Sequence, residues 1–264
     1  MDTLGYFASI LIGVSLGLIG GGGSILTVPV LVYLLGLSPV LSTAYSLFVV
    51  GTTSLVGSFT YMRKQLVNYR AALVFAVPSF ITVFLTRKFL VPAIPDPVFT
   101  LGEFTLSKGA GIMGLFALIM LAAAFSMIRH KVDKEKDSEG KGTSFNYPLI
   151  GLEGAAVGLL TGLVGAGGGF LIIPALVLLA KLPMKMAVGT SLLIIAAKSL
   201  IGFLGDVGQQ AIDWNFLAIF TSLSVVGIFL GSYLTRFIPG EKLKRIFGWF
   251  VLGMAVFILW KEFF

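Results

Sequence analysis

The feature that most constrains this chain is a series of apolar runs of about twenty residues each, which occupy most of its length. A helix needs about 20 apolar residues to cross the hydrocarbon core of a bilayer, and the core helices of soluble proteins rarely sustain such runs. Only 12% of the 264 residues are charged, about half the share that is usual in a soluble domain. The sequence therefore predicts an all-α polytopic membrane protein.

The basic residues that give the chain its net charge of +7 lie between the apolar runs. Positive loops are typical of membrane proteins, and no basic stripe with interleaved aromatic residues favours a nucleic-acid partner. The chain has no cysteine, and its one histidine, His130, lies in a charged loop. We therefore expect no catalytic residue, no metal site, no cofactor and no nucleic acid.

The two halves of the chain are related by an internal repeat. Placing the segment that begins at Gly13 against the one that begins at Gly158, an offset of 145 residues, aligns them without a gap. Apolar composition alone would not match so many Gly, Pro and Ser positions in one register, so we infer a duplication. Identical pairs include Gly17/Gly162, Gly20/Gly165, Gly22/Gly167, Gly23/Gly168, Pro29/Pro174, Leu31/Leu176, Ser46/Ser191, Ser54/Ser199 and Gly57/Gly202.

A polar stretch at residues 129–147 (RHKVDKEKDSEGKGTSFNY) divides the chain into a transmembrane repeat at 1–128, a hydrophilic linker and a second transmembrane repeat at 148–264. In each half we expect a glycine-broken apolar pair and three full-length helices, or about 8 to 10 membrane helices in all. The broken pairs are Leu4–Ile19 with Ile25–Leu35 and Pro148–Val164 with Phe170–Leu182; the full-length helices are Pro39–Tyr61, Ala71–Leu90, Ser107–Ile128, Met184–Gly205, Trp214–Phe237 and Leu243–Trp260.

The distribution of Lys and Arg among the loops predicts the orientation in the plasma membrane. Three segments are basic: the loop after the first full-length helix, the linker 129–147, and the loop before the last helix. If all three are cytoplasmic, both termini lie outside, and each broken stretch either crosses twice or enters and returns on one side. The halves then insert as inverted-topology repeats, as in many secondary transporters. One loop fits poorly, because Arg87–Lys108 lies outside although it has three basic residues.

Two glycine-rich runs interrupt the broken pairs: Gly20-Gly21-Gly22-Gly23-Ser24 and Gly165-Ala166-Gly167-Gly168-Gly169. Irregular backbone at membrane depth survives only inside the protein or along a wet cavity, and a helix that begins after such a break attracts anions. We interpret the runs as functional breaks, and scattered glycines such as Gly13 and Gly158 as helix-packing positions. The runs match neither a dinucleotide fingerprint nor a P-loop.

Polar side chains within the predicted spans are further site candidates. Lys198 lies within Met184–Gly205 and either binds an anion or a coupling proton or extends to the interface; its repeat partner is Thr53. Ser46, Thr190 and Ser191 offer hydroxyl donors beside the breaks, with Ser54 and Ser199 further along the same helices.

The segment Gly162–Ile195 (GLVGAGGGFLIIPALVLLAKLPMKMAVGTSLLII) resembles the sulfite exporter TauE/SafE family, also called the toluenesulfonate uptake permease family, and Gly17–Leu31 (GLIGGGGSILTVPVL) is similar to its N-terminal motif. The resemblance covers nearly the whole chain. It implies ATP-independent transport of sulfite, sulfoacetate, other organosulfonates or thiosulfate-like anions. The first half departs from the motif, with Ala44-Tyr45-Ser46 in place of Gly189-Thr190-Ser191, which favours a larger role for the second half.

We therefore expect a secondary transporter whose substrate, a small sulfur-containing anion, is held at the breaks between the repeats, in the lipid bilayer, with a proton or sodium as possible coupling ion. A passive anion channel is the alternative, and an intramembrane enzyme or assembly factor is a third class. The candidate substrate-binding residues are Gly20, Gly21, Gly22, Gly23, Ser24, Ser46, Gly165, Ala166, Gly167, Gly168, Gly169, Thr190, Ser191 and Lys198.

Overall fold

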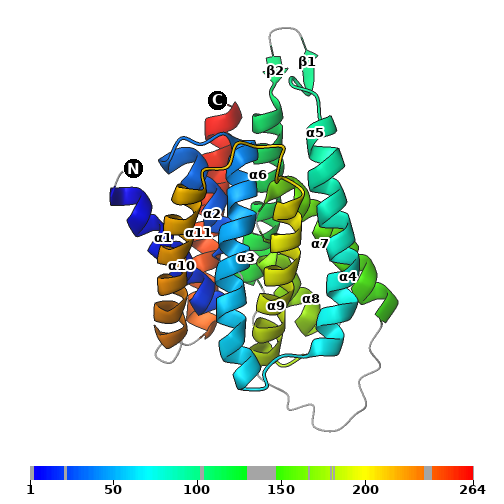
Figure 1. The fold of residues 1–264 in the computed structure, drawn as a ribbon, viewed down its shortest axis with the longest axis vertical. Coiled ribbons are helices and arrows are strands. Elements are labelled where there is room, and N and C mark those ends of the chain that lie inside the picture. Colours follow the sequence, from blue (N-terminus) through cyan, green and yellow to red (C-terminus); the bar gives the residue numbers. More distant parts are fainter. Residues whose placement is uncertain are drawn as a thin grey trace.

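The computed structural model describes residues 3–20, 23–101, 104–129, 147–165, 167–178, 180, 182–234 and 240–263. Within these ranges the chain is helical apart from one small hairpin and short connections (Figure 1). The elements are α1 (Thr3–Ile19), α2 (Ser24–Pro29), η1 (a π-helix, Val30–Leu34), α3 (Pro39–Arg63), α4 (Tyr69–Leu85), η2 (a π-helix, Thr86–Leu90), α5 (Val91–Ala93), β1 (Phe99–Leu101), β2 (Phe104–Leu106), α6 (Lys108–Arg129), α7 (Tyr147–Val164), α8 (Gly169–Leu178), α9 (Met184–Leu204), α10 (Trp214–Leu234) and α11 (Gly240–Phe263).

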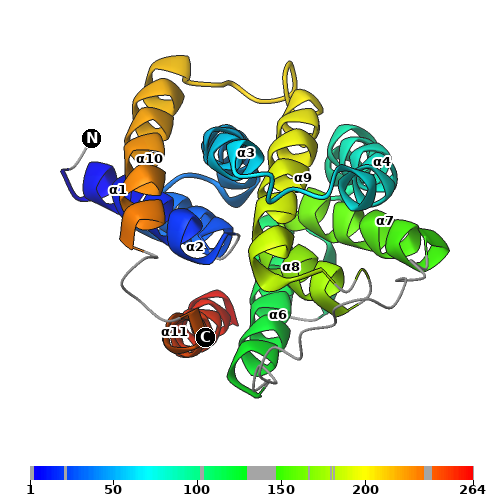
Figure 2. The same cartoon turned by 90° about the horizontal axis from the view of Figure 1, so that it is seen from below.

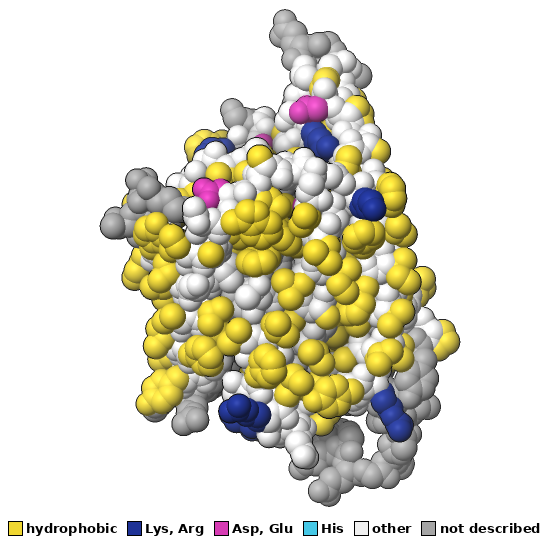
Figure 3. All heavy atoms as spheres, in the orientation of Figure 1, with side chains coloured by type: hydrophobic (Ala, Val, Ile, Leu, Met, Phe, Trp, Pro, Cys, Tyr) yellow, Lys and Arg dark blue, Asp and Glu magenta, His cyan; other side chains and the backbone are white. Residues whose placement is uncertain are grey.

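The prediction of an all-α polytopic membrane protein is confirmed. In the described part of the chain, five helices are long and apolar enough to cross a membrane: Pro39–Arg63, Tyr69–Ala93, Lys108–Phe125, Lys185–Leu204 and Trp214–Leu234. Three shorter apolar helices are Leu4–Leu18, Ser24–Leu34 and Pro148–Val164. Figure 3 shows hydrophobic side chains over the flank of the molecule and charged ones toward its two ends, as a bilayer requires.

The helix boundaries lie within a few residues of those expected from the sequence, and one of the differences bears on the site. The helix that was expected to end at Leu90, in a loop with basic residues, continues through η2 and α5 to Ala93. Beyond it the loop forms the antiparallel hairpin β1–β2, which was not predicted because its strands have only three residues each. Arg87 therefore lies on a helix and not in the loop.

Side-chain caps at repeat-related positions start two of the long helices. The Asn68 side chain accepts a hydrogen bond from Ala71 N (3.0 Å) at the start of α4, and the Asp213 side chain accepts one from Phe216 N (3.0 Å) at the start of α10. Such caps satisfy amide groups that the first turn of a helix leaves without partners. The same local chemistry has been kept in both halves.

Four helix pairs account for most of the packing: α1 with α10, α4 with α7, α3 with α9, and α6 with α11. Each pair joins one half of the chain to the other, and exchanging the halves converts α1–α10 into α7–α4. Viewed from below, α3 and α9 lie centrally, with α1 and α10 on one side and α4 and α7 on the other (Figure 2). The center of the molecule is thus formed by one helix from each half.

Scattered glycines allow the two outer pairs to approach closely. A methyl group at Gly13 would overlap the backbone of Ser224, and one at Gly227 would overlap the carbonyl of Ile10, so α1 and α10 meet backbone to backbone. Gly154 and Gly158 allow the same approach of α7 to α4, at the carbonyls of Phe75 and Ser79. Small residues commonly mediate such packing in membranes, which confirms the packing interpretation of these glycines.

The direction of the chain can be followed in Figure 1. Both labelled termini lie toward the upper end of that view, and the end of α6 and the start of α7 lie toward the lower end. α3 runs downward and α9, beside it, runs upward. α1 and α2–η1 together leave the upper end and return to it, whereas α7 and α8 leave the lower end and return there. Each broken pair therefore begins and ends toward the same end of the molecule.

Candidate functional site

The second glycine run forms the sharp turn between α7 and α8. Gly165, Gly167 and Gly168 have φ angles of +72°, +61° and +67°, in the left-handed region where a side chain costs conformational energy and glycine does not. Ala166 lies outside the described residues. The glycines are needed here because the chain reverses within a few residues while packed among α3, α7 and α9.

The first glycine run forms the corresponding turn between α1 and α2. Gly20 has φ +74°, and a Cβ atom at Gly23 would lie 2.5 Å from Leu16 N, so no larger residue fits against α1. Gly21 and Gly22 lie outside the described residues. Gly20 packs on Val188 in the first turns of α9, and Ser191 Oγ lies 3.4 Å from the Gly20 carbonyl oxygen. α1 thus extends far across the molecule before the chain turns back.

The two breaks meet between the central helices. A Cβ atom added at Gly167 would lie 3.1 Å from Cβ of Ser24, 2.7 Å from Val50 and 3.6 Å from Ile195. Ser24 begins α2, Val50 belongs to α3 and Ile195 to α9. The starts of α2 and α8, one from each half, therefore lie next to each other at the middle of α3 and α9.

Lys198 is the cation at this meeting point. Its side chain is 0% exposed, so it does not extend to the interface. Its ammonium group donates a hydrogen bond to Thr161 Oγ1 (3.2 Å) and lies 2.6 Å from where a Cβ atom at Gly168 would be. No ion pair joins it to an acidic side chain in the described ranges. A buried ammonium group without a counter-charge is costly, and it is well placed to bind an anion.

Serine hydroxyls flank the meeting point at repeat-related positions. Ser46 and Ser54 lie one helical turn on either side of Val50, on the same face of α3. Their Oγ atoms are buried and have no hydrogen-bond partner within the described chain, and the same holds for Ser199 on α9 and for Oγ1 of Thr53. Buried hydroxyls normally have partners, so these groups are available to a ligand.

Thr190 makes a different contact. Its Oγ1 accepts a hydrogen bond from Asn68 N (2.9 Å), in the turn between α3 and α4. At the repeat-related position, the Tyr45 hydroxyl accepts one from Asp213 N (2.7 Å), in the turn between α9 and α10. Thr190 and Tyr45 therefore make the same contact, a hydrogen bond that a turn amide donates to the side-chain hydroxyl. The difference between Ala44-Tyr45-Ser46 and Gly189-Thr190-Ser191 is thus no evidence by itself that the two breaks have different roles. Ser191 also has a partner, since its Oγ donates to Val188 O (2.8 Å).

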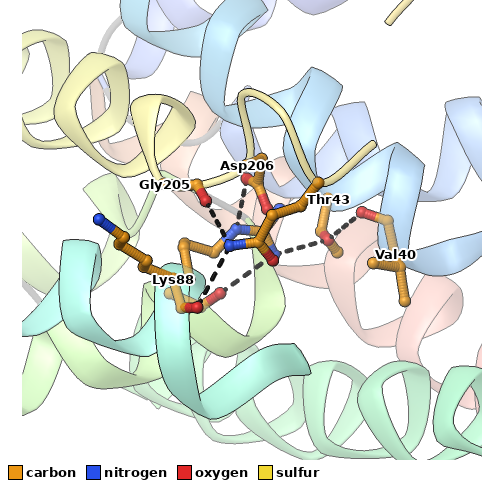
Figure 4. A network of polar contacts seen from close by, with 8 residues as sticks. Val40, Thr43, Lys88, Gly205 and Asp206 are labelled. Atoms are coloured by element: carbon orange, nitrogen blue, oxygen red, sulfur yellow. Dashed lines mark hydrogen bonds and ion pairs between the residues drawn. The ribbon is translucent and has the colours of Figure 1, made fainter. Parts of the chain in front are cut away.

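A charged network near the ends of four helices was missed by the sequence analysis (Figure 4). Arg87, in η2 just beyond α4, is fully buried, and its Nε donates to the Asp206 carboxylate, just beyond α9, at 2.7 Å. Its Nη1 donates to Thr43 Oγ1 (2.9 Å) on α3 and to Gly162 O (3.2 Å) on α7. The available signal was Arg87 within the apolar run Ala71–Leu90, since a charge in such a run needs a partner.

In the described ranges, no group of three His, Asp or Glu side chains could hold a metal ion. Among the described residues, hydroxyls, backbone amides and the Lys198 ammonium group lie at the breaks. These groups donate hydrogen bonds and positive charge, and so can bind an anion.

Comparison with known proteins identifies the family of the chain. The family model described as Sulfite exporter TauE/SafE matches residues 6–258. A "Probable membrane transporter protein" of Xylella fastidiosa (strain 9a5c) is 30% identical over 259 residues, 96% of this chain and 92% of that protein. The "Probable membrane transporter protein YunE" of Bacillus subtilis (strain 168) is 28% identical over 232 residues, 83% of each chain. No solved structure matches the chain significantly.

Proposed function

The chain belongs to the sulfite exporter TauE/SafE family and is a membrane transporter rather than an enzyme, and we propose that it is a secondary transporter of a small sulfur-containing anion. Sulfite, an organosulfonate such as sulfoacetate, and a thiosulfate-like anion are the candidate substrates. The substrate would be held where the two glycine-rich breaks meet, between one helix of each half.

The observation that carries the proposal is the buried Lys198 beside the start of α8. The Lys198 ammonium group lies against Gly168, one residue before α8 begins at Gly169. The N-terminus of a helix carries a partial positive charge and attracts anions. The eleven-residue helix Ser24–Leu34 begins beside Gly167 from the other half. Two helix N-termini and one cation thus converge on a region where no described acidic side chain pairs with Lys198.

The hydroxyl groups of Ser46, Ser54 and Ser199 complement these charges. Each is buried without a partner among the described residues, and each lies one turn from a residue that packs on Gly167. A sulfur oxyanion has several oxygen atoms that must all be hydrogen-bonded when it leaves water. Donors on both α3 and α9 could bind different oxygen atoms of one substrate, which favours a polyoxygenated anion over a halide.

We propose alternating access through movement of one inverted repeat against the other. The opposite directions of α3 and α9 in Figure 1 support this, as do the symmetric contacts and the shared turn contacts of Tyr45 and Thr190. Substrate sites between inverted repeats are typical of secondary transporters. A proton or a sodium ion would supply the driving force, because the sequence has no P-loop.

For the orientation, we propose a plasma-membrane protein with the linker 129–147 in the cytoplasm and both termini outside. Burial of Arg87 in an ion pair supports this assignment. It removes one of the three basic residues from the Arg87–Lys108 loop, and the positive-inside rule applies to charges that stay in loops.

The test is a flux assay with purified protein in proteoliposomes. We expect saturable flux of radiolabelled sulfite, sulfoacetate or thiosulfate, and a loss of at least tenfold in Lys198→Gln. Saturable flux of none of these anions would refute the proposed substrate class. Electrical recording distinguishes the alternative, because currents well above roughly a thousand ions per second would indicate a channel; enzyme turnover and transport are commonly slower than that.

A further inference from the structure

The Arg87 network near the upper end of the molecule is not explained by the proposed substrate site. It joins η2, which continues α4, to the first turns of α3, the last turn of α7 and the residue that follows Gly205 beyond α9 (Figure 4). In the same place, Gln209 Nε2 donates to Lys88 O (3.2 Å) and to Gly205 O (3.0 Å), which ties α4 to α9 a second time. This is the end of the molecule that carries both termini.

The Arg87 guanidinium group has an unused donor. Nε and Nη1 have partners, but Nη2 is buried and donates to nothing in the described structure. Guanidinium binds carboxylates and other oxyanions best through two parallel hydrogen bonds. Asp206 uses only one such bond, so Arg87 retains the capacity to bind a second or a better-fitting oxyanion.

The Asp206 carboxylate lies in an unfavourable place for an anion. It follows Gly205, which caps the C-terminus of α9, where the helix dipole is negative and favours cations. Asp206 is therefore stabilised by Arg87 and not by its own helix. An oxyanion that offered two hydrogen-bonding oxygen atoms to Arg87 could take its place.

The two buried cations are attached to neighbouring residues of α7. Lys198 donates to Thr161 and Arg87 donates to Gly162, just before the break at Gly165. Along α9, the six residues from Lys198 to Leu204 span about 9 Å, and Asp206 follows two residues beyond the end of the helix. Arg87 thus lies between the upper end of the molecule and the Lys198 site. The two cations are near each other, since they donate to adjacent residues of α7.

From these contacts we propose that Arg87 is a second anion-binding group, at which the substrate exchanges with the Asp206 carboxylate on its way between Lys198 and the end that carries both termini. This inference rests on the proposed transport of a sulfur oxyanion. When the substrate occupies Arg87, Asp206 is released, and the strongest tie between α4 and α9 is broken. Substrate binding and the opening of this end are thereby coupled.

Among the described residues, the opposite end of the molecule has no matching ion pair. The repeat-related positions of Arg87 and Asp206 are Ser232 and Tyr61, which cannot form an ion pair. The exchange is therefore expected to affect transport from one side only. This asymmetry makes the proposal testable apart from the central site.

The first test measures sulfite binding by calorimetry on the purified protein in lipid nanodiscs. Asp206→Asn removes the competing carboxylate and keeps its shape, so we expect at least tenfold tighter binding and a melting temperature that rises with sulfite. Adding Arg87→Lys keeps the positive charge but removes the pair of parallel guanidinium hydrogen bonds. This second change should return the sulfite affinity to that of the wild type. Wild-type affinity in Asp206→Asn, or a gain that survives Arg87→Lys, would overturn the proposal.

A second variant keeps the test valid if Asp206→Asn does not fold. The neutral pair Arg87→Gln with Asp206→Asn removes both charges of the ion pair together, so neither is left buried without its partner. In right-side-out and inverted vesicles, we expect the sulfite KM to rise at least tenfold from the side of the termini and to stay unchanged from the linker side. Equal KM changes on both sides would show a purely structural ion pair.

Gln209→Leu is the matched control, because it removes the neighbouring ties to Lys88 and Gly205 and leaves Arg87 intact. We expect it to leave both KM values unchanged; a one-sided rise in this variant would attribute the effect to loosening and refute anion exchange. If the wild type carries no sulfur oxyanion, the proposed function fails. If wild-type flux is normal and the Arg87 and Asp206 variants match it from both sides, only the exchange at Arg87 fails.

Discussion

Two glycines with nearly the same backbone conformation allow a controlled test of the proposed site. Gly168, at the meeting of the breaks, has φ +67°, and Gly36, in the turn before α3, has φ +68°. Alanine in the left-handed region costs about 1–2 kcal/mol. A Cβ atom at Gly36 would meet nothing within 4 Å. Gly36→Ala therefore measures the backbone cost alone.

At Gly168 the same change has a second effect. The new Cβ would lie 2.6 Å from Lys198 Nζ and would overlap the Thr161 methyl group, so the ammonium group must move away. Its 3.2 Å hydrogen bond to Thr161 would then be lost, at about 1.5–3 kcal/mol for a bond to a charged group. We expect Gly168→Ala to be less stable than Gly36→Ala by about this amount.

The assay combines chemical denaturation with sulfite flux, both normalised to folded protein. If Lys198 binds the substrate, its displacement should weaken substrate affinity about tenfold or more, because ~1.4 kcal/mol corresponds to a factor of ten. Gly36→Ala should transport like the wild type. If Gly168→Ala has the same sulfite KM and maximal flux as Gly36→Ala, the role of the break in substrate binding is refuted.

Three further predictions follow from single contacts. Lys198→Gln should lose flux without lowering the melting temperature, because it removes a buried charge that has no counter-ion; a large loss of stability would indicate a structural lysine. Thr190→Val and Tyr45→Phe should each lower the free energy of unfolding by about 1–3 kcal/mol, since each leaves a turn amide without its acceptor; an altered sulfite KM would contradict this structural role. Gly227→Leu should prevent α1 from packing on α10, and size-exclusion chromatography should show aggregation; a monodisperse, active protein would contradict the close packing.

The fold was largely predictable because each of its determinants is local. The length of an apolar run identifies a helix, and runs of glycine mark where a helix cannot continue. The ungapped repeat also predicted that the two halves would share their parts, and the structure adds matching helix caps at Asn68 and Asp213. The sequence could not predict which helix of one half packs on which helix of the other. A glycine such as Gly13 indicates that another helix approaches closely, but it does not identify that helix.

The candidate site was predictable in part for a similar reason. Gly167, Ser24 and Lys198 were singled out by composition and position, and the structure brings them together. Thr190 was singled out by the same reasoning, yet it contacts a turn. A hydroxyl in a span looks the same in the sequence whether it holds a loop or faces a ligand. The partner alone distinguishes these roles, and the partner lies in the other half of the chain.

The differences between the halves are informative because the rest of the architecture is shared. In the repeat alignment, Lys198 is matched by Thr53. Arg87 is matched by Ser232, and Asp206 by Tyr61. The scaffold contacts, such as those of Tyr45 and Thr190, survive a change of residue type, whereas the buried charges have no counterpart. A symmetric scaffold needs no charge to fold, and burying one has a cost. Buried charges that lack a counterpart at the repeat-related position are therefore best explained by binding of a ligand. This ligand would pass from Lys198 to Arg87, or from Arg87 to Lys198, during transport.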